Sequence, residues 1–252
     1  MMNEAAPKRR GGGRAGNRRR GGAAISQLPW SIPTLTDAPV EPLRPEQVEA
    51  IDNAAMRILE EVGIDFLHPE ARAHLKAAGA DVDPVSERVR FDRAMVRELV
   101  ARAPSEFTIT PRNPAHTVTI GGRHQVFSTV ASPPNCSDLD RGRRAGTLED
   151  YRNFLRLAQA FNCIHLVGGY PVEPVDVHAS IRHLECIRDK LVLTDKAAHA
   201  YALGTERVED AMEMVRIAGG LTWEEFEAAP RMFTNIRSEE RRVGKECPSP
   251  CR

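Results

Sequence analysis

The second half of the chain repeats one pattern, in which a short apolar run typical of a strand is followed by an amphipathic helical stretch. Four strands are predicted, at 125–131, 164–168, 191–194 and 232–236. The four units average roughly 28 residues each, close to the spacing expected of a (β/α)8 barrel. The alternation therefore predicts an α/β fold that forms the N-terminal half of a TIM-type barrel.

Helices are predicted between these strands. The first is opened by a capping pair, Thr147 and Asp150, and the next two span 177–188 and 205–218. A doubly wound open sheet would share the alternation, but it usually carries a glycine-rich turn after its first strand. Residues 128–135 read STVASPPN and contain no such turn, so the barrel is favoured.

A small α+β region is predicted before the barrel. Apolar residues recur at helical spacing over 45–63, 69–78 and 92–102, with Pro45 and Asp92 suited to helix starts. Strands are expected at 88–91, 107–110 and 118–120, and Gly121-Gly122 predicts a hairpin that leads into 125–130.

The chain ends differ in composition from the rest. Residues 1–24 form a basic, Gly/Arg-rich tail that we expect to be disordered, and the proline-rich start of 25–124 predicts an extended arm. The barrel units fill 125–236. The remainder, 237–252, begins RSEERRVGKEC, which resembles the translation of a sequencing adapter. We expect an artefact there, and hence a truncated chain that is inactive alone; the alternative is a genuine charged tail.

Charge and composition exclude several classes of protein. Lys plus Arg and Asp plus Glu are both 35, so the basic tail leaves a mildly acidic body, and we expect no nucleic-acid partner. The sequence has no run of about 18 apolar residues, so we expect a cytoplasmic protein with no membrane contact. Five widely spaced cysteines predict free thiols, and no cluster with metal-ligand spacing is found.

Several long phrases occur in order between Leu43 and Ile236, and they resemble the trimethylamine methyltransferase family. The phrases are AAMRILEEVGIDFLHPEARAHLKAAGADVD at 54–83, APSEFTITPRNPAHTVTIGG at 103–122, LVGGYPVEPVDV at 166–177 and LTDKAAHAY at 193–201. The resemblance implies a (β/α)8 barrel that moves a methyl group from trimethylamine or a betaine-like quaternary amine to Co(I). It also implies that the corrinoid (cobalamin) is carried by a partner protein, that none is bound directly, and that the full-length protein is a homo-oligomer.

The family divides into enzymes with a pyrrolysine in the site and enzymes without it that act on betaine-like amines. The pyrrolysine position implied by the resemblance lies beyond Ile236. The sequence therefore leaves open which methylated amine is the substrate.

Candidate site residues follow from the barrel rule that functional groups lie at the carboxyl ends of the strands. A methylated ammonium is held by aromatic faces and nearby carboxylates, so Tyr170 is expected to supply a ring and Glu173 a charge after the second strand. The alternative for Tyr170 is a packing role in a turn. His199 is expected to handle a proton after the third strand, close to Asp195 and Lys196. Asn135 and Asn235 complete the set, and no catalytic residue is assigned.

A second class of function stays open. A non-catalytic binding or scaffold protein would retain half of the barrel and use the Arg-rich tail for an acidic partner. A barrel enzyme of unrelated chemistry is a third possibility, because a fold alone does not fix a reaction.

Overall fold

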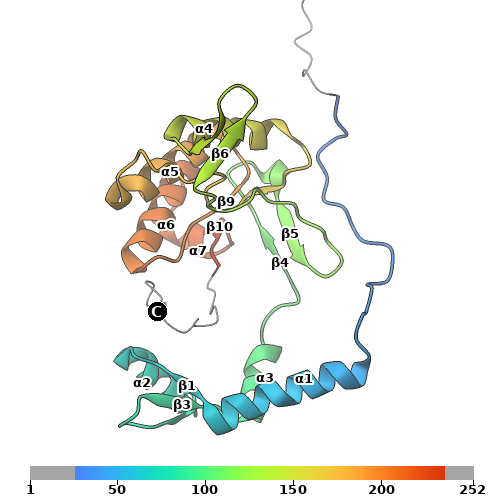
Figure 1. Cartoon of the computed structure of the whole chain (residues 1–252), viewed down its shortest axis with the longest axis vertical. Helices are drawn as coiled ribbons and strands as arrows, with labels where there is room; N and C mark the ends of the chain where they lie inside the picture. Colours follow the sequence, from blue (N-terminus) through green and yellow to red (C-terminus); the bar gives the residue numbers. More distant parts are fainter. Residues whose placement is uncertain (1–25, 236–252) are drawn as a thin grey trace, which may run out of the picture.

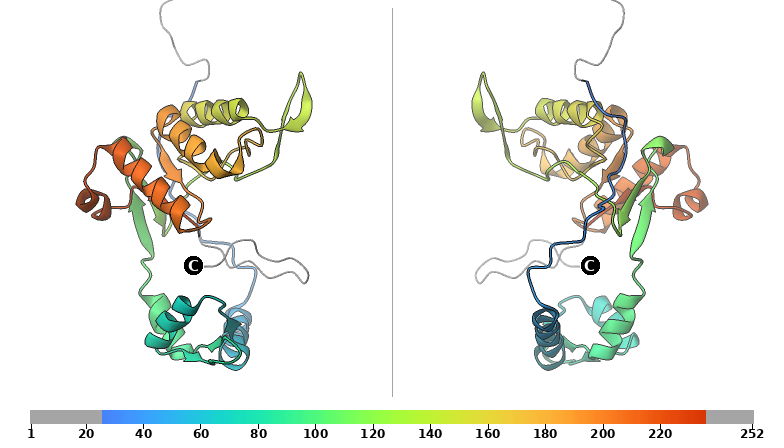
Figure 2. Two further views of the ribbon diagram at one scale, coloured as in Figure 1. Left: turned by 90° about the vertical axis from the view of Figure 1, so that its left-hand side faces the viewer. Right: turned by 90° about the vertical axis from the view of Figure 1, so that its right-hand side faces the viewer.

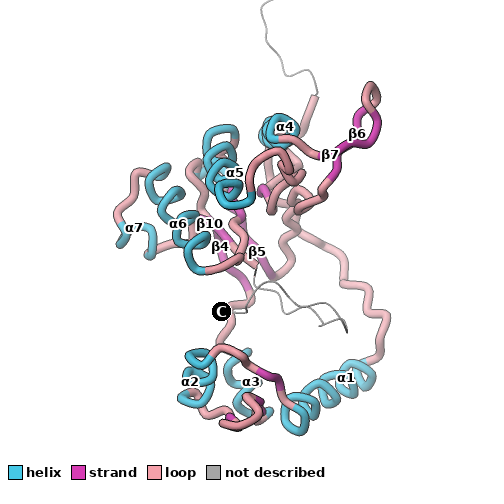
Figure 3. The backbone as a smooth tube through the Cα atoms, turned by 60° about the vertical axis from the view of Figure 1, so that its left-hand side comes forward, coloured by secondary structure: helices cyan, strands magenta, loops and turns pink. Residues whose placement is uncertain are grey.

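The computed structural model describes residues 26–235 as a mixed α/β chain (Figure 1). A small N-terminal unit lies apart from a larger unit, and an extended arm and a short connector run between them (Figures 1 and 3). The expectations for 1–24 and 237–252 lie outside the described residues.

The N-terminal unit contains three α-helices, one π-helical segment and a three-stranded antiparallel sheet. Its helices begin where the sequence predicts: Pro45 is the first residue of α1, and the Asp92 side chain accepts hydrogen bonds from the backbone N–H of Ala94 and Met95. Gly63, with a φ of 74°, ends the first helical stretch. The elements are α1 (Pro45–Arg57), the π-helical η1 (Ile58–Val62), β1 (Ile64–Asp65), α2 (Pro69–Ala77), β2 (Asp81–Val82), β3 (Arg88–Arg90) and α3 (Arg93–Ala101).

An antiparallel hairpin opens the larger unit. Strand β4 (Glu106–Ile109) pairs with β5 (Val118–Gly121) around the short 3-10 helix η2 (Pro114–His116). The predicted hairpin from 118–120 into 125–130 is therefore wrong. The backbone N–H of Gln125 donates to Pro33 O of the arm instead, so the chain after Gly121-Gly122 leaves β5 rather than folding back on it.

Three short strands form a parallel sheet in sequential order: β8 (Leu166–Val167), β9 (Ala197–His199) and β10 (Met232–Phe233). The strand predicted at 125–131 is reduced to one parallel bridge between Ser128 and Leu166. This bridge places a fourth chain segment beside β8. The result is four neighbouring parallel segments in chain order, and within residues 26–235 they form an open sheet.

Helices connect the parallel segments. Helix α4 (Leu148–Ala160) contacts α5 (Ala179–Leu193), and α5 contacts α6 (Thr205–Gly219), so the three form one continuous layer (Figure 1). The short helix α7 (Trp223–Glu227) follows α6 and is capped by Thr222. Right-handed crossovers between adjacent parallel strands place successive helices on one side of a sheet.

The strand predicted at 191–194 is wrong. Helix α5 continues to Leu193, and the strand begins three residues after Thr194. Leu191 packs against Ile187 and Leu193 packs against the cluster beneath α4, so the apolar run is the last turn of the helix. This apolar run is too short to identify a strand, because a run of that length fits the end of a helix equally well.

Adjacent residues of β8 face two different cores. Val167 packs on the helix side with Tyr151, Leu155 and Cys186. Leu166 packs on the other side with Ile109 and Val118 of the β4–β5 hairpin, together with Ala197 of β9. This alternation is expected of a parallel strand buried on both faces.

The arm packs along the larger unit. Trp30 lies 5.1 Å from the His116 ring and 5.7 Å from the His165 ring, measured between ring centroids. Thr34 forms an isolated antiparallel bridge with His124. Residues 26–44 contain no helix, and this part of the arm lies against the larger unit.

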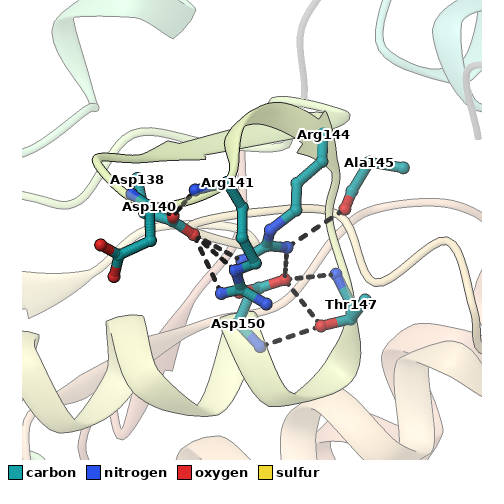
Figure 4. A network of polar contacts seen from close by, with 7 residues as sticks. All are labelled: Asp138, Asp140, Arg141, Arg144, Ala145, Thr147 and Asp150. Atoms are coloured by element: carbon teal, nitrogen blue, oxygen red, sulfur yellow. Dashed lines mark hydrogen bonds and ion pairs between the residues drawn. The ribbon is translucent and has the colours of Figure 1, made fainter.

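A second hairpin, which the sequence analysis missed, projects from the chain before α4 (Figure 2). Strand β6 (Asn135–Asp138) pairs with β7 (Gly142–Ala145), and Gly142 at the turn has a φ of 65°. Its strands consist mainly of polar residues and lack the apolar alternation that indicates a strand. Only the residues at the turn therefore indicate a hairpin. An ion-pair network ties the hairpin to α4: the Arg144 guanidinium contacts Asp138 and Asp150 (Figure 4). The hydrogen bond from Arg144 holds the pKa of Asp150 well below its usual range.

The predicted capping pair of α4 is confirmed, and it supports a test. Thr147 Oγ1 accepts from the backbone N–H of Asp150, and Asp150 in turn accepts from the backbone N–H of Thr147 (Figure 4). We expect Thr147→Ala to lower the free energy of unfolding by about 1 kcal/mol, the usual effect of losing an N-cap. Urea unfolding measures this, with the exposed Ser137→Ala as control. An unchanged midpoint in Thr147→Ala would contradict the role of the cap.

Candidate functional site

The carboxyl ends of β8 and β9 bring together a cluster of aromatic and basic side chains, which we call the strand-end cluster. Its members follow or face the ends of the two strands, and they are Ser132, Gly169, Tyr170, Lys190, His199, Tyr201 and Phe233. In parallel α/β folds this edge is where ligands bind.

Tyr201 is the hydrogen-bonding centre of the strand-end cluster. Its hydroxyl bonds to Ser132 Oγ and accepts from the backbone N–H of Tyr170 at 3.0 Å. Gly169 makes this approach possible, because a Cβ at that position would collide with the Tyr201 hydroxyl. Gly169 also has a φ of 47°, a conformation that side chains disfavour. The glycine therefore fixes where the Tyr201 ring lies.

His199 has a defined tautomer. Its Nδ1 accepts a hydrogen bond from the backbone N–H of Gly169 at 3.1 Å, so the ring proton belongs on Nε2. Within residues 26–235, the buried Nε2 has no hydrogen-bond partner. Burial, followed by the nearby charge of Lys190, lowers the pKa of His199 to about 4. The imidazole is therefore neutral near pH 7 and presents an unused N–H.

Lys190 is buried at the same place, with 2% of its surface exposed. Its Nζ donates to the carbonyl oxygen of Gly169 at 2.9 Å and to that of His199 at 2.8 Å. Burial lowers the pKa of Lys190 to about 7. The side chain therefore ties β8 to β9 through two carbonyl groups, and its charge is easily lost.

The aromatic rings of the strand-end cluster form a chain of contacts, which are edge-on except for a tilted contact between His199 and Phe233. Tyr170 lies between Tyr151 and Tyr201, at centroid separations of 5.9 and 4.8 Å. His199 lies between Tyr201 and Phe233, at 5.0 and 4.9 Å. Tyr170 is 7% exposed, whereas Tyr201 and Phe233 are half-buried. Tyr201 and Phe233 therefore keep part of their surface exposed at this end of the sheet.

The structure brings together two of the five residues singled out in the sequence, Tyr170 and His199. Glu173 forms an ion pair with Arg182 instead of standing free. Asn135 pairs with Ala145 at the start of β6. Asn235 is exposed, two residues beyond β10. Among the described residues, no hydrogen bond or ring contact joins Asn135 or Asn235 to the cluster.

Asp195 and Lys196 lie before β9 rather than after it, which corrects their expected place near the carboxyl ends of the strands. Asp195 accepts from Asn113 at 2.8 Å and from Gln159 at 2.9 Å. Lys196 Nζ donates to two carbonyl groups near the end of α4, and burial lowers its pKa to about 8. Both side chains form hydrogen bonds that stabilise the opposite end of the sheet.

Sequence reasoning missed Lys190, Tyr201 and Phe233. The misplaced third strand explains Tyr201, because a strand at 197–199 puts this residue directly after the carboxyl end. Lys190 has no sequence signal, since it falls in a helix rich in charged residues. The sequence predicts a strand around Phe233 but gives no signal that places this residue in a site.

Two further findings concern the described residues only. No group of three or more His, Cys, Asp or Glu side chains is arranged to hold a metal ion between residues 26 and 235. Over the same residues, none of the helices has the length and apolar character needed to cross a bilayer.

Comparison with known proteins identifies relatives of the chain. The family model for trimethylamine methyltransferase (MTTB) matches residues 9–243. A glycine betaine methyltransferase of Desulfitobacterium hafniense strain Y51 is 38% identical over 178 residues, which cover 71% of this chain and 37% of that protein. A trimethylamine methyltransferase MttB from strain DCB-2 of the same species is 23% identical over 177 residues, 70% of this chain and 35% of the relative.

A proline betaine:corrinoid methyltransferase of Eubacterium limosum is 28% identical over 131 residues, 52% of this chain and 26% of the relative. The chain spans little more than a third of the length of the two Desulfitobacterium relatives. The resemblance seen in the sequence phrases is thus confirmed by a match that covers most of the residues, and the chain belongs to the trimethylamine methyltransferase family.

Proposed function

We propose that the protein transfers a methyl group from a betaine-type quaternary amine to the Co(I) centre of a separate corrinoid protein. Family membership supports methyl transfer. The identity of 38% with a glycine betaine methyltransferase, against 23% with a trimethylamine methyltransferase over almost the same number of residues, favours a betaine. The name of the E. limosum relative supports a corrinoid as the acceptor.

The proposed fold is the first half of a (β/α)8 barrel. Four parallel segments lie side by side in chain order, with the helices that join them packed against one another. A doubly wound sheet would place its fourth strand beside the first. The sequential order therefore supports the barrel, and the strand-end cluster corresponds to the mouth where barrel enzymes bind substrate.

The single observation that carries the function is the strand-end cluster itself. Tyr201 and Phe233 offer half-buried rings beside a neutral His199. Aromatic faces attract a quaternary ammonium within about 6 Å of the ring centroid, and partial burial strengthens the attraction. A compact cation bound there would lie at the open edge of the sheet, where a second protein can approach.

The chemistry of a quaternary amine suits these residues. The Co(I) corrinoid supplies the electron pair that forms the new bond to carbon. The electrons of the broken C–N bond leave with the nitrogen, so the product is a neutral tertiary amine and no proton is needed at the leaving group. The site has only to bind the cation, orient one methyl group outward and exclude water.

The test is a methyl-transfer assay on the protein expressed from its complete reading frame. Glycine betaine and cob(I)alamin are mixed with it, and loss of the Co(I) absorbance is followed together with the amine product. We expect methylcobalamin and dimethylglycine in equal amounts. We expect Tyr201→Leu to lower kcat/KM about tenfold by removing one ring.

The matched control is Phe107→Leu, which removes a partly exposed ring from β4. It should keep the wild-type rate. Cobalamin that stays in the Co(I) state with glycine betaine, trimethylamine and other methylated amines would contradict the proposed function.

A further inference from the structure

His199 carries a buried hydrogen-bond donor that the fold leaves unused. The Gly169 N–H occupies Nδ1, which fixes the proton on Nε2. His199 is 6% exposed, and no acceptor reaches Nε2 among residues 26–235. A buried polar atom without a partner is unfavourable, so such atoms in native structures point to a missing partner.

Lys190 gives a second, independent indication of the same partner. Its ammonium donates to the backbone carbonyl groups of His199 and of Gly169, whose N–H bonds to the imidazole. No carboxylate pairs with Lys190 in the described part of the chain. Cys186 is near, but burial raises the pKa of its thiol to about 12, so the thiol stays neutral. An anion bound nearby would stabilise the charged form of Lys190.

The rings beside His199 indicate what else the ligand carries. The rings of Tyr201 and Phe233 both contact the imidazole, at centroid separations of 5.0 and 4.9 Å. A ligand that reaches Nε2 therefore also meets aromatic surface, which favours a cation. A betaine joins a quaternary ammonium to a carboxylate through a short carbon chain, and so presents both charges over such a distance.

We propose that His199 Nε2–H donates a hydrogen bond to the carboxylate of the betaine while the ammonium lies against Tyr201 and Phe233. This carboxylate subsite rests on the proposed function and deepens it. His199 is then the residue that makes the protein bind betaines in preference to simple methylated amines, which have no carboxylate. Gly169 is a positioning residue, because its N–H sets the tautomer.

The test compares two ligands that differ by the carboxylate, glycine betaine and tetramethylammonium, by titration calorimetry. We expect wild-type protein to bind glycine betaine at least tenfold more tightly, as a hydrogen bond to a charged group provides. His199→Phe keeps a ring but removes the donor, and it should bring the two affinities within about twofold. The exposed His74→Phe of α2 should keep the wild-type ratio.

A second measurement needs no substitution at the site. The ¹⁵N and proton resonances of His199 Nε2–H in wild-type protein should shift on addition of glycine betaine and stay in place with tetramethylammonium. If wild-type protein binds both ligands equally, or if the resonance responds to both alike, the carboxylate subsite is overturned and the proposed function stands. If neither ligand binds, the proposed function fails with it.

Discussion

Replacing Gly169 by alanine is expected to destabilise the protein by about 3 kcal/mol and to abolish ligand binding at the strand-end cluster. The backbone at Gly169 has a φ of 47°, which is unfavourable by roughly 1–2 kcal/mol for a residue with a Cβ. The new methyl group would also collide with the Tyr201 hydroxyl and with Ala131 Cβ, which adds the strain of overpacking. Urea unfolding and titration with glycine betaine measure the two effects.

The matched control for this substitution is Gly220→Ala. Gly220 has a φ of 63°, and a Cβ there would meet no atom within 4 Å. Only the unfavourable backbone conformation would therefore destabilise this variant. The double variant Gly169→Ala with Tyr201→Phe removes the colliding oxygen and should recover part of the lost stability, as a coupling between neighbours. Equal destabilisation by Gly169→Ala and Gly220→Ala would show that the close approach of Tyr201 does not matter.

The substitution Lys190→Met is expected to change the pH dependence of stability. The pKa of Lys190 is about 7 in the folded protein, below its ordinary value of 10.5, because the side chain is buried. Between these two values the unfolded chain binds a proton that the folded chain does not. The free energy of unfolding therefore gains up to about 1.4 kcal/mol from this group for each pH unit of increase. The destabilisation caused by burying protonated Lys190 is fully present below pH 7 and vanishes as the pH approaches 10.5.

Unfolding by urea at pH 7 and pH 9 measures this effect. The stability of wild-type protein relative to Lys190→Met should rise by about 2 kcal/mol between the two pH values. The difference between the proteins isolates Lys190 from the buried tyrosines and cysteines, which titrate in the opposite sense. Lys76→Met, at an exposed position of α2, should follow the wild type at both values. Parallel pH profiles for wild type and Lys190→Met would refute the burial account of this lysine.

The starts of helices could be predicted well from the sequence because they depend on local chemistry. The Asp92 cap, the Thr147–Asp150 pair and the start of α6 at Thr205 lie where the sequence indicates. Each depends on residues within one turn of the helix, so no long-range contact is needed to find them.

Strand assignments failed where tertiary contacts decide the structure. The apolar run 191–194 ends α5 because Leu191 and Leu193 find partners on the helix side. The segment 125–131 keeps only the bridge at Ser128, since its neighbours bond to the arm and to His165. The β6–β7 hairpin carries no apolar alternation at all.

The candidate site could be predicted only in outline. The barrel rule predicted a site at the carboxyl end of the sheet, and the structure brings two of the residues named for it, Tyr170 and His199, together there. It could not foresee that Arg182 neutralises Glu173, because that pairing depends on how the loop folds over α5. The roles of Lys190 and Gly169 follow from burial and backbone geometry, which a sequence pattern does not display.

The central claim is that the strand-end cluster binds the quaternary ammonium of a betaine. The most direct measurement is an NMR titration with glycine betaine, in which nuclear Overhauser effects are recorded between its N-methyl protons and the aromatic ring protons. The account predicts saturable binding, with contacts from the N-methyl groups to the rings of Tyr201 and Phe233. Absence of binding, or contacts that map to the pocket at the opposite end of the sheet lined by Arg112 and Arg231, would contradict it.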